Sequence, residues 1–242
     1  MEPRLEALYE ECKGLMLDSK AVVEEVEKYR QDWKPSKTKV VLLAESHAHT
    51  TQAQFNRLLK KDFHHRDGTR CRYVNFVYCI GNSESYALEK ETSIRSSTTQ
   101  YWRILYSCLN PIRGNRDFYL FVSGSSRDRI NHKRKLLNDL KKARIRLVDA
   151  SIIGINVLDI EARRDVIRKC WNSRLASMLK RLRIAGLRSV ITVGSPVSDE
   201  LQSDLEEMKL EVKTIPQPQA HVIGGYLSYY KLIHQTCQKY RT

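Results

Sequence analysis

Short apolar runs alternate with longer amphipathic segments along this chain, and each apolar run ends in a group of polar residues. The clearest run is residues 39–44, Lys-Val-Val-Leu-Leu-Ala, which opens into the polar stretch 45–50. A continuous apolar run of this length is typical of a strand that is buried on both faces of a parallel sheet. The same pattern predicts further strands at residues 117–122, 146–151, 189–193 and 212–215. Residues 73–80 are compatible with either a strand or an aromatic loop.

Amphipathic segments lie between these strands and predict helices. Residues 4–30 carry an apolar stripe and a net acidic surface, and further helices are expected at residues 97–108, 131–144, 163–183 and from 199–201 onward. Strands that alternate with helices indicate an α/β fold, which we expect to be a three-layer α/β/α sandwich around a mostly parallel sheet. We interpret residues 1–35 as an N-terminal helical appendage and residues 36–242 as a single domain.

The charge of the chain is concentrated in two segments. The 242 residues include 42 Lys and Arg against 28 Asp and Glu, which gives a formal net charge of +14. Residues 127–146 contain nine basic and two acidic side chains, and residues 163–188 contain nine basic and one acidic. Charge gathered in this way favours a nucleic-acid partner, which binds through its phosphates. The alternative is that both segments are ordinary solvated helix faces, because apolar residues recur at helical spacing in them.

Composition also excludes several classes of protein. The mean hydropathy is −0.50 and no apolar run approaches the roughly 20 residues that span a bilayer, so we expect no membrane segment. The first residues do not form a secretory signal, and we expect a cytoplasmic protein. The six cysteines contain no Cys-x-x-Cys pair and no closely spaced ligand set. We therefore expect reduced, structural thiols, no metal and no organic cofactor.

Five short segments carry a family resemblance when they are taken in order. They are residues 43–48 (Leu-Ala-Glu-Ser-His-Ala), 101–105 (Tyr-Trp-Arg-Ile-Leu), 148–149 (Val-Asp), 191–195 (Ile-Thr-Val-Gly-Ser) and 215–218 (Ile-Pro-Gln-Pro). Over about residues 36–235 the chain resembles the uracil-DNA glycosylase superfamily, particularly its small mismatch-specific, single-strand-selective and thermophilic branches. Two features depart from the family pattern. The first segment lacks the usual glycine and proline, and an isoleucine begins the last segment where the family has His or Asn.

The resemblance implies a uracil-DNA-glycosylase-like fold and a monomeric DNA glycosylase that flips out a base and hydrolyses its N-glycosidic bond. Such cleavage passes through an oxocarbenium-like sugar, so it needs a negative group near the sugar and donors toward the leaving base. Glu45 occupies the place of the acidic residue of the thermophilic branch; alternatively it caps a helix or pairs with a surface lysine. His47 and His221 are candidate donors, because imidazole donates in either protonation state.

Asp149 lies where uracil-specific relatives carry an asparagine. A carboxylate accepts from the exocyclic amine of cytosine but cannot donate to uracil O4 unless it is protonated. Asp149 therefore favours a cytosine-type base, and restriction to a modified base leads to the best hypothesis, an anti-phage glycosylase that removes glucosylated hydroxymethylcytosine. The alternative is that Asp149 is a helix cap or a buried ion-pair partner.

The remaining candidates are groups that contact the base or the DNA. Phe76 and Tyr78 are expected to stack on a flipped base, with Ser46 as a further base-binding residue, although alternating aromatics often belong to a core. Phosphate-binding candidates are Ser125, Arg127, Arg129, Lys133, Arg134, Ser195, Gln217 and Gln219. Three other functions stay open: a uracil or mismatch repair glycosylase, a non-catalytic nucleic-acid-binding protein that keeps the fold, and a nucleotide-processing enzyme whose basic faces bind RNA.

Overall fold

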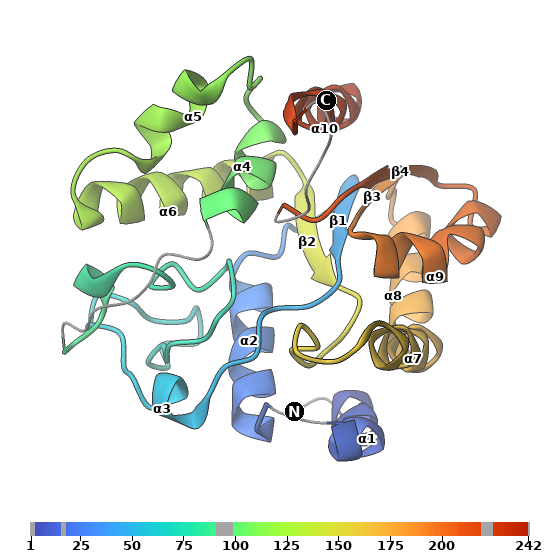
Figure 1. The fold of residues 1–242 in the computed structure, drawn as a ribbon, viewed down its shortest axis with the longest axis horizontal. Coiled ribbons are helices and arrows are strands. Elements are labelled where there is room, and N and C mark those ends of the chain that lie inside the picture. The colour runs from blue at the N-terminus through green and yellow to red at the C-terminus, as the bar shows by residue number, and fades with distance from the viewer. Residues whose placement is uncertain (1–2, 16–17, 91–98, 219–224, 242) are drawn as a thin grey trace.

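A four-stranded parallel sheet forms the centre of the molecule (Figure 1). The structure is a computed structural model, and it describes residues 3–15, 18–90, 99–218 and 225–241. The strands are β1 (Val40–Ala44), β2 (Ile145–Asp149), β3 (Ser189–Val193) and β4 (Glu211–Ile215), in the order β2-β1-β3-β4. The register pairs Ala44 with both Asp149 and Val193, and Val193 with Ile215. All four carboxyl ends therefore meet at one edge of the sheet.

Strand β1 divides the apolar core into two parts. Its five residues are all buried, and successive side chains of a strand point to opposite faces. Val40 and Leu42 belong to one buried cluster, whereas Val41 and Leu43 belong to the other. Burial of each side chain of this size contributes roughly 1.5–3 kcal/mol relative to exposure. The apolar run of β1 therefore stabilises the core on both faces of the sheet.

Helices cover both faces of the sheet (Figure 1). On the face of Val40 and Leu42 they are α2 (Lys20–Asp32), α4 (Thr99–Ser107), α5 (Asn115–Val122), α6 (Ser126–Lys142) and α10 (Leu227–Lys239). On the other face they are α1 (Pro3–Cys12), α7 (Ile160–Cys170), the π-helix η3 (Trp171–Leu175), α8 (Ala176–Ile184) and α9 (Ser195–Glu207). The α/β class and the parallel sheet are thus confirmed, and the layering is that of a three-layer sandwich. None of the described helices has the length and apolar character needed to cross a membrane.

Short helical turns complete the described structure. They are η1 (Lys13–Leu15), α3 (Gln52–Phe55) and η2 (Ser85–Ala87). Between α3 and η2, residues 73–80 form a loop rather than a strand, and the backbone N–H of Cys79 donates to the carbonyl of Phe76 at 3.0 Å. This loop is aromatic and buried, so its apolar side chains fill the core.

The strand predicted at residues 117–122 is wrong, because these residues belong to α5. The carboxylate of Asp117 accepts from the backbone N–H groups of Arg113 and Gly114 at 2.6 and 3.0 Å, which fixes the start of the helix. Phe118 and Phe121 are then one helical turn apart, and their rings stack at 5.2 Å. Packing against the core has overridden the β-propensity of this aromatic segment.

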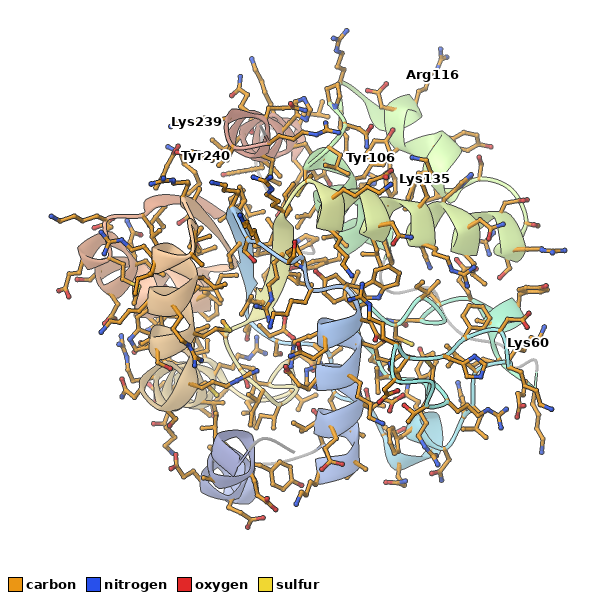
Figure 2. All side chains as sticks on the ribbon, turned by 180° about the vertical axis from the view of Figure 1, so that it is seen from behind. Lys60, Tyr106, Arg116, Lys135, Lys239 and Tyr240 are labelled. Carbon is orange, nitrogen blue, oxygen red and sulfur yellow. The ribbon has the colours of Figure 1, made fainter. Side chains whose placement is uncertain are left out.

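The N-terminal segment also differs from the expected single helix over residues 4–30. It forms α1 and α2, and the described break between them includes Asp18. Val22, Val26 and Tyr29 of α2 are buried in the core of the sheet, and in Figure 1 and Figure 2 this helix lies in the middle of the molecule. The N-terminal segment therefore contributes core residues to the domain predicted over residues 36–242.

His65 joins α2 to the loop that follows β1. Its Nε2 lies 3.0 Å from a Glu25 oxygen and its Nδ1 lies 2.6 Å from an Asp32 oxygen. Burial opposes the charged ring, but the hydrogen bond with Asp32 and further contacts with Cys71 and Glu25 raise the pKa of His65 to about 11. The folded state therefore holds this ring as an imidazolium that bridges two carboxylates.

We predict that His65→Gln lowers the free energy of unfolding by about 3 kcal/mol near pH 6, since it leaves two carboxylates without their cation. Because the pKa of His65 is higher when the protein is folded, its contribution is fully present below pH 6.5 and is lost as the pH rises toward 11. Urea unfolding at a series of pH values measures this difference. The exposed neighbour His64 provides the control, and an equal effect of His64→Gln would contradict the prediction.

Candidate active site

A cavity of about 140 Å³ lies at the carboxyl edge of the sheet. Ligands of open parallel sheets bind at this edge. It is lined by Ala44, Glu45, Ser46, His47, Ala48, Tyr101, Asn156, Arg163, Val193, Gln217 and Pro218. Its volume is close to the ~150 Å³ of cavities that hold a benzene ring, so the described walls enclose the space of one six-membered ring.

Glu45 is the carboxylate of this cavity. It follows directly after β1 and is 6% exposed. Its Oε1 lies 3.3 Å from Nη1 of Arg163, and its Oε2 accepts from Nε2 of Gln217. Burial raises the pKa of Glu45 above its usual value, although Arg163 and Gln217 act in the opposite direction. The result is a fixed carboxylate that is more basic than one in water.

Gly194 allows Gln217 to reach Glu45. This glycine ends β3 and precedes α9 with φ of +97°, a conformation that favours glycine. A Cβ at this position would lie 2.7 Å from Cγ of Gln217. The turn after β3 therefore needs glycine both for its backbone and for the close approach of the amide side chain.

Arg163 is held in place by the loop that follows β2. Its Nε donates to the carbonyl of Leu158 and its Nη2 to the carbonyl of Asn156, both at 2.8 Å. It lies in the first turns of α7, whose N-cap Asp159 accepts from the N–H of Ala162. The guanidinium thus reaches Glu45 in a fixed orientation that three contacts determine.

His47 is the buried imidazole of the cavity, with 3% of the residue exposed. Its Nε2 lies 3.1 Å from Oδ2 of Asp18, and its Nδ1 lies 3.8 Å from Oδ2 of Asp149, too far for a hydrogen bond. Among the described residues Nδ1 has no hydrogen-bond partner. Burial opposes the charged form, but the two carboxylates raise the pKa of His47 above its usual value.

Tyr101 contributes a second donor without a partner. It lies on α4, lines the cavity, and its buried hydroxyl has no hydrogen-bond partner within the described ranges. Burial and the charge of Asp149 raise the pKa of Tyr101 well above its usual value, which keeps the hydroxyl protonated. An orphan donor that lines a cavity indicates a place where a bound ligand can offer an acceptor.

Asp149 has a different environment from the one expected for a base-reading residue. It ends β2 but does not line the cavity, and its side chain is 2% exposed. Its Oδ2 lies 2.5 Å from Nη2 of Arg30. Burial opposes ionisation, yet Arg30 and His47 lower the pKa of Asp149 below its usual value. The geometry supports the alternative that Asp149 is a buried ion-pair partner.

Two further base-binding candidates belong to the core. The hydroxyl of Tyr78 accepts from the backbone N–H of Leu147 at 2.9 Å, and the ring of Phe76 lies 5.2 Å from the guanidinium of Arg30. Neither lines the cavity, whereas Ser46 does, with its hydroxyl accepting from the N–H of Ile155. His221 and Gln219 lie outside the described residues.

Several predicted phosphate ligands on α6 are already paired with protein groups. Arg129 and Lys133 both contact the buried carboxylate of Glu84, at 2.8 and 2.9 Å. Arg134 lies against the ring of Phe63. Ser125 caps the helix and remains exposed, as does the following Arg127. Part of the basic charge therefore stabilises the fold rather than forming a free surface.

Two predicted phosphate ligands outside α6, Ser195 and Gln217, have different surroundings. Ser195 is exposed at the start of α9, while Gln217 binds Glu45 inside the cavity. The second basic segment is also partly neutralised, because Arg168 contacts Glu200 and Asp204. Exposed cations remain on α8 and after it, at Lys180, Arg181, Arg183 and Arg188.

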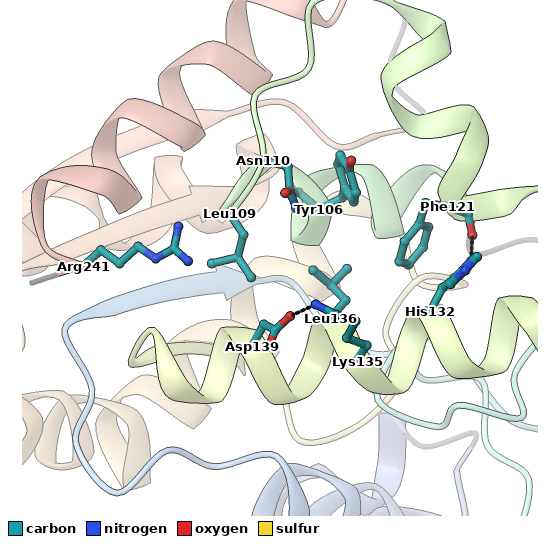
Figure 3. A pocket seen from close by; sticks show the side chains of 9 residues that line it. All are labelled: Tyr106, Leu109, Asn110, Phe121, His132, Lys135, Leu136, Asp139 and Arg241. Carbon is teal, nitrogen blue, oxygen red and sulfur yellow. Dashed lines mark hydrogen bonds and ion pairs between the residues drawn. The ribbon is translucent and has the colours of Figure 1, made fainter.

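A larger cavity of about 430 Å³ lies between α4 and α6 (Figure 3). Its carboxylate, Asp139, lies 2.5 Å from Nζ of Lys135, and His132 donates from Nδ1 to the carbonyl of Phe121 at 3.1 Å. These polar groups satisfy one another, as the dashed lines of Figure 3 show. We therefore place the candidate site at the smaller cavity, where a buried carboxylate lies beside donors that have no partner.

Asp18, Tyr101, Asn156 and Arg163 were not predicted as site residues. Tyr101 belongs to a segment quoted for the family resemblance, and Arg163 was counted only as part of a basic segment. Asn156 follows β2 in a mostly apolar stretch, residues 150–158, so no group of polar residues marked it. In the part of the chain that the structure describes, no group of three His, Cys, Asp or Glu residues could hold a metal ion.

Comparison with known proteins identifies no relative. No family, no curated protein and no solved structure matches this chain.

We predict that Arg163→Gln raises the pKa of Glu45 further, because the substitution removes the nearest cation from a buried carboxylate. NMR titration of the labelled glutamate carboxyl carbons measures this pKa, with Glu45→Gln used to assign the signal. Arg164→Gln is the matched control, since Arg164 pairs with the exposed Asp199 instead. An unchanged or lowered pKa in Arg163→Gln would show that Arg163 does not control this carboxylate.

Proposed function

We propose that this protein is a DNA glycosylase that hydrolyses the N-glycosidic bond of a flipped-out pyrimidine and leaves an abasic site. The observation that carries the proposal is the buried Glu45 carboxylate, fixed by Arg163 and Gln217 in a cavity of one-ring size. Extrusion of the target nucleotide is required because the bond is inaccessible within a duplex. The resemblance of the strand-end segments to the uracil-DNA glycosylase superfamily supports the same reaction.

Glu45 acts on the sugar side of the reaction. As the C–N bond breaks, its electron pair moves to the base and positive charge develops on the sugar ring. The ionised carboxylate stabilises that charge and accepts a proton from the water whose oxygen bonds to the anomeric carbon. Arg163 keeps a sufficient fraction of Glu45 ionised, and Gln217 orients it.

His47 and Tyr101 act on the base side. Both line the cavity, and each has a buried donor atom without a hydrogen-bond partner among the described residues. The departing pyrimidine carries the electron pair of the broken bond, mainly on its ring carbonyl oxygen. Donors already in place for that charge lower the barrier because they need no reorganisation during the reaction.

The cavity size bears on which base is removed. A volume of about 140 Å³ accommodates a pyrimidine ring, whereas a glucosylated hydroxymethylcytosine carries a second ring and requires the cavity to open. Asp149, which favoured cytosine, is paired with Arg30. We therefore propose an unmodified or lightly modified pyrimidine as the substrate. The glucosylated hydroxymethylcytosine of phage DNA is the alternative substrate, and the assay below includes it.

A second candidate function is nucleic-acid binding without catalysis. The specific observation in its favour is the group of exposed cations on α8 and after it, Lys180, Arg181, Arg183 and Arg188. Phosphate contacts of this kind give salt-dependent binding without any reaction. Both functions predict that the protein binds DNA. Only the glycosylase predicts that a change of Glu45 abolishes a reaction.

We predict that Glu45→Gln lowers the rate of base removal by about 10²–10⁴-fold, since it removes the charge and the base while keeping the side-chain shape. Alkaline cleavage of oligonucleotides carrying uracil, cytosine, hydroxymethylcytosine or its glucosylated form measures this rate under single-turnover conditions. DNA affinity should remain unchanged. Glu11→Gln, an exposed change on α1, should leave both quantities unaltered.

Two outcomes would overturn the glycosylase proposal. One is the absence of cleavage at all four bases by the unaltered protein together with tight, salt-dependent binding, which would establish the binding function. The other is cleavage that Glu45→Gln leaves intact, which would place the reaction elsewhere. Cleavage only at the glucosylated base would keep the reaction but show that the cavity opens.

A further inference from the structure

Asp18 lies outside the cavity but contacts both loops that form its wall. One carboxylate oxygen, Oδ2, lies 3.1 Å from Nε2 of His47 and accepts from the N–H of Gly154 at 2.6 Å. The other, Oδ1, lies 2.8 Å from Nδ1 of His49 and accepts from the N–H of Thr50 at 2.9 Å. His47, His49 and Thr50 follow β1, whereas Gly154 follows β2, so a single side chain joins the two strand-end loops.

The loops also contact each other directly around Asp18. The N–H of His49 donates to the side chain of Asn156 at 2.7 Å, and the N–H of Ile155 donates to the hydroxyl of Ser46 at 3.2 Å. A Cβ at Gly154 would lie 2.6 Å from the backbone nitrogen of His49 and 2.9 Å from an Asp18 oxygen. A side chain at position 154 would therefore force the two loops apart.

Charged groups surround His47 on two sides. The Asp18 side chain is fully buried, and although burial opposes its ionisation, contacts with His47, Thr50 and Gly154 lower the pKa of Asp18 to about 2. On β2, Asp149 lies 3.8 Å from the other ring nitrogen, with Arg30 of α2 behind it. Phe76 supplies an uncharged ring 6.1 Å away. The imidazole is thus held between two ionised carboxylates.

We propose that Asp18 is a positioning residue of the site: through Nε2 it holds the His47 ring in the cavity wall, with Nδ1 left without a hydrogen bond, and it fixes the spacing of the two loops. This inference rests on the proposed glycosylase function, in which His47 faces the departing base. Asp18 itself touches no substrate. The N-terminal segment therefore completes the site, because Asp18 and Arg30 both lie within residues 1–35.

The first test uses Asp18→Asn, with Asp165→Asn as a control for an exposed aspartate on α7. We expect Asp18→Asn to lower kcat for base removal about 10–100-fold with KM changed less than threefold, because DNA contacts remain. In a His47→Gln background the same substitution should have a clearly smaller effect, because the part that acts through the ring is gone and only the contacts with His49, Thr50 and Gly154 remain to be lost. Equal effects in both backgrounds would overturn the positioning role.

The second test needs no activity and so separates this inference from the proposed function. Nitrogen-15 NMR titration of the imidazoles, with His47→Gln for assignment, should give His47 a pKa above the usual histidine value in the unaltered protein, because Nε2 contacts the Asp18 carboxylate. In Asp18→Asn this pKa should fall, whereas the pKa of His65 should not change. A pKa of His47 that Asp18→Asn leaves unchanged would contradict the inference even if base removal is observed.

Gly154→Ala keeps the inference testable if Asp18→Asn does not fold. The added methyl group pushes the backbone of His49 away from the β2 loop, so we expect a changed His47 signal with an unchanged His65 signal. Gly14→Ala is the control, because a Cβ there meets no atom within 4 Å. An unaltered His47 signal in Gly154→Ala would show that loop spacing does not position the ring.

Discussion

The buried carboxylate of Asp18 is the interaction on which the arrangement of the site depends. Four donors from two separate loops converge on it, and without them an ionised group so deeply buried would be strongly destabilising. The same four contacts place Ser46, His47 and Asn156 around one cavity. The parallel sheet brings the loops to the same edge, and Asp18 sets the distance between them.

Opposite charges alternate through the site in two separate groups. Asp18, His47, Asp149 and Arg30 form one buried series that determines the charge and orientation of the imidazole. Glu45 and Arg163 form the other, in which burial raises the pKa of the carboxyl group and Arg163 opposes that rise. A reaction that places positive charge on a sugar and negative charge on a base requires this separation of a carboxylate from donors. In the proposed reaction, the two groups act on opposite ends of the bond that breaks.

The sequence predicted the parts of the fold that depend on local pattern. The runs at β1, β2 and β3 are strands in which every residue is buried, whereas the predicted strand β4 lies at the edge of the sheet and is only partly buried. Residues 117–122 have the same composition as a strand, yet Phe118 and Phe121 pack one helical turn apart. Composition alone cannot distinguish these outcomes, since the partner surfaces come from distant segments.

The sequence also predicted those site residues that a local pattern marks, but not those that distant segments contribute. Polar residues after β1 and β4 indicated Glu45, His47 and Gln217, and these side chains do meet in one cavity. Asp149 also lies at the end of a strand, but its side chain pairs with Arg30, which is 119 positions earlier in the chain. Asp18 is 136 positions from Gly154, and no spacing rule connects them. Contacts of this range follow from the assembled sheet rather than from any local pattern.

The central claim is that the cavity beside Glu45 receives a base from DNA. A crystal structure of the Glu45→Gln variant with a single-stranded oligonucleotide that contains one uracil tests it most directly. We expect a flipped pyrimidine in the cavity, with its ring oxygens near His47 and Tyr101 and its sugar beside position 45. DNA bound along the basic surface of α8 with the cavity empty would contradict the account.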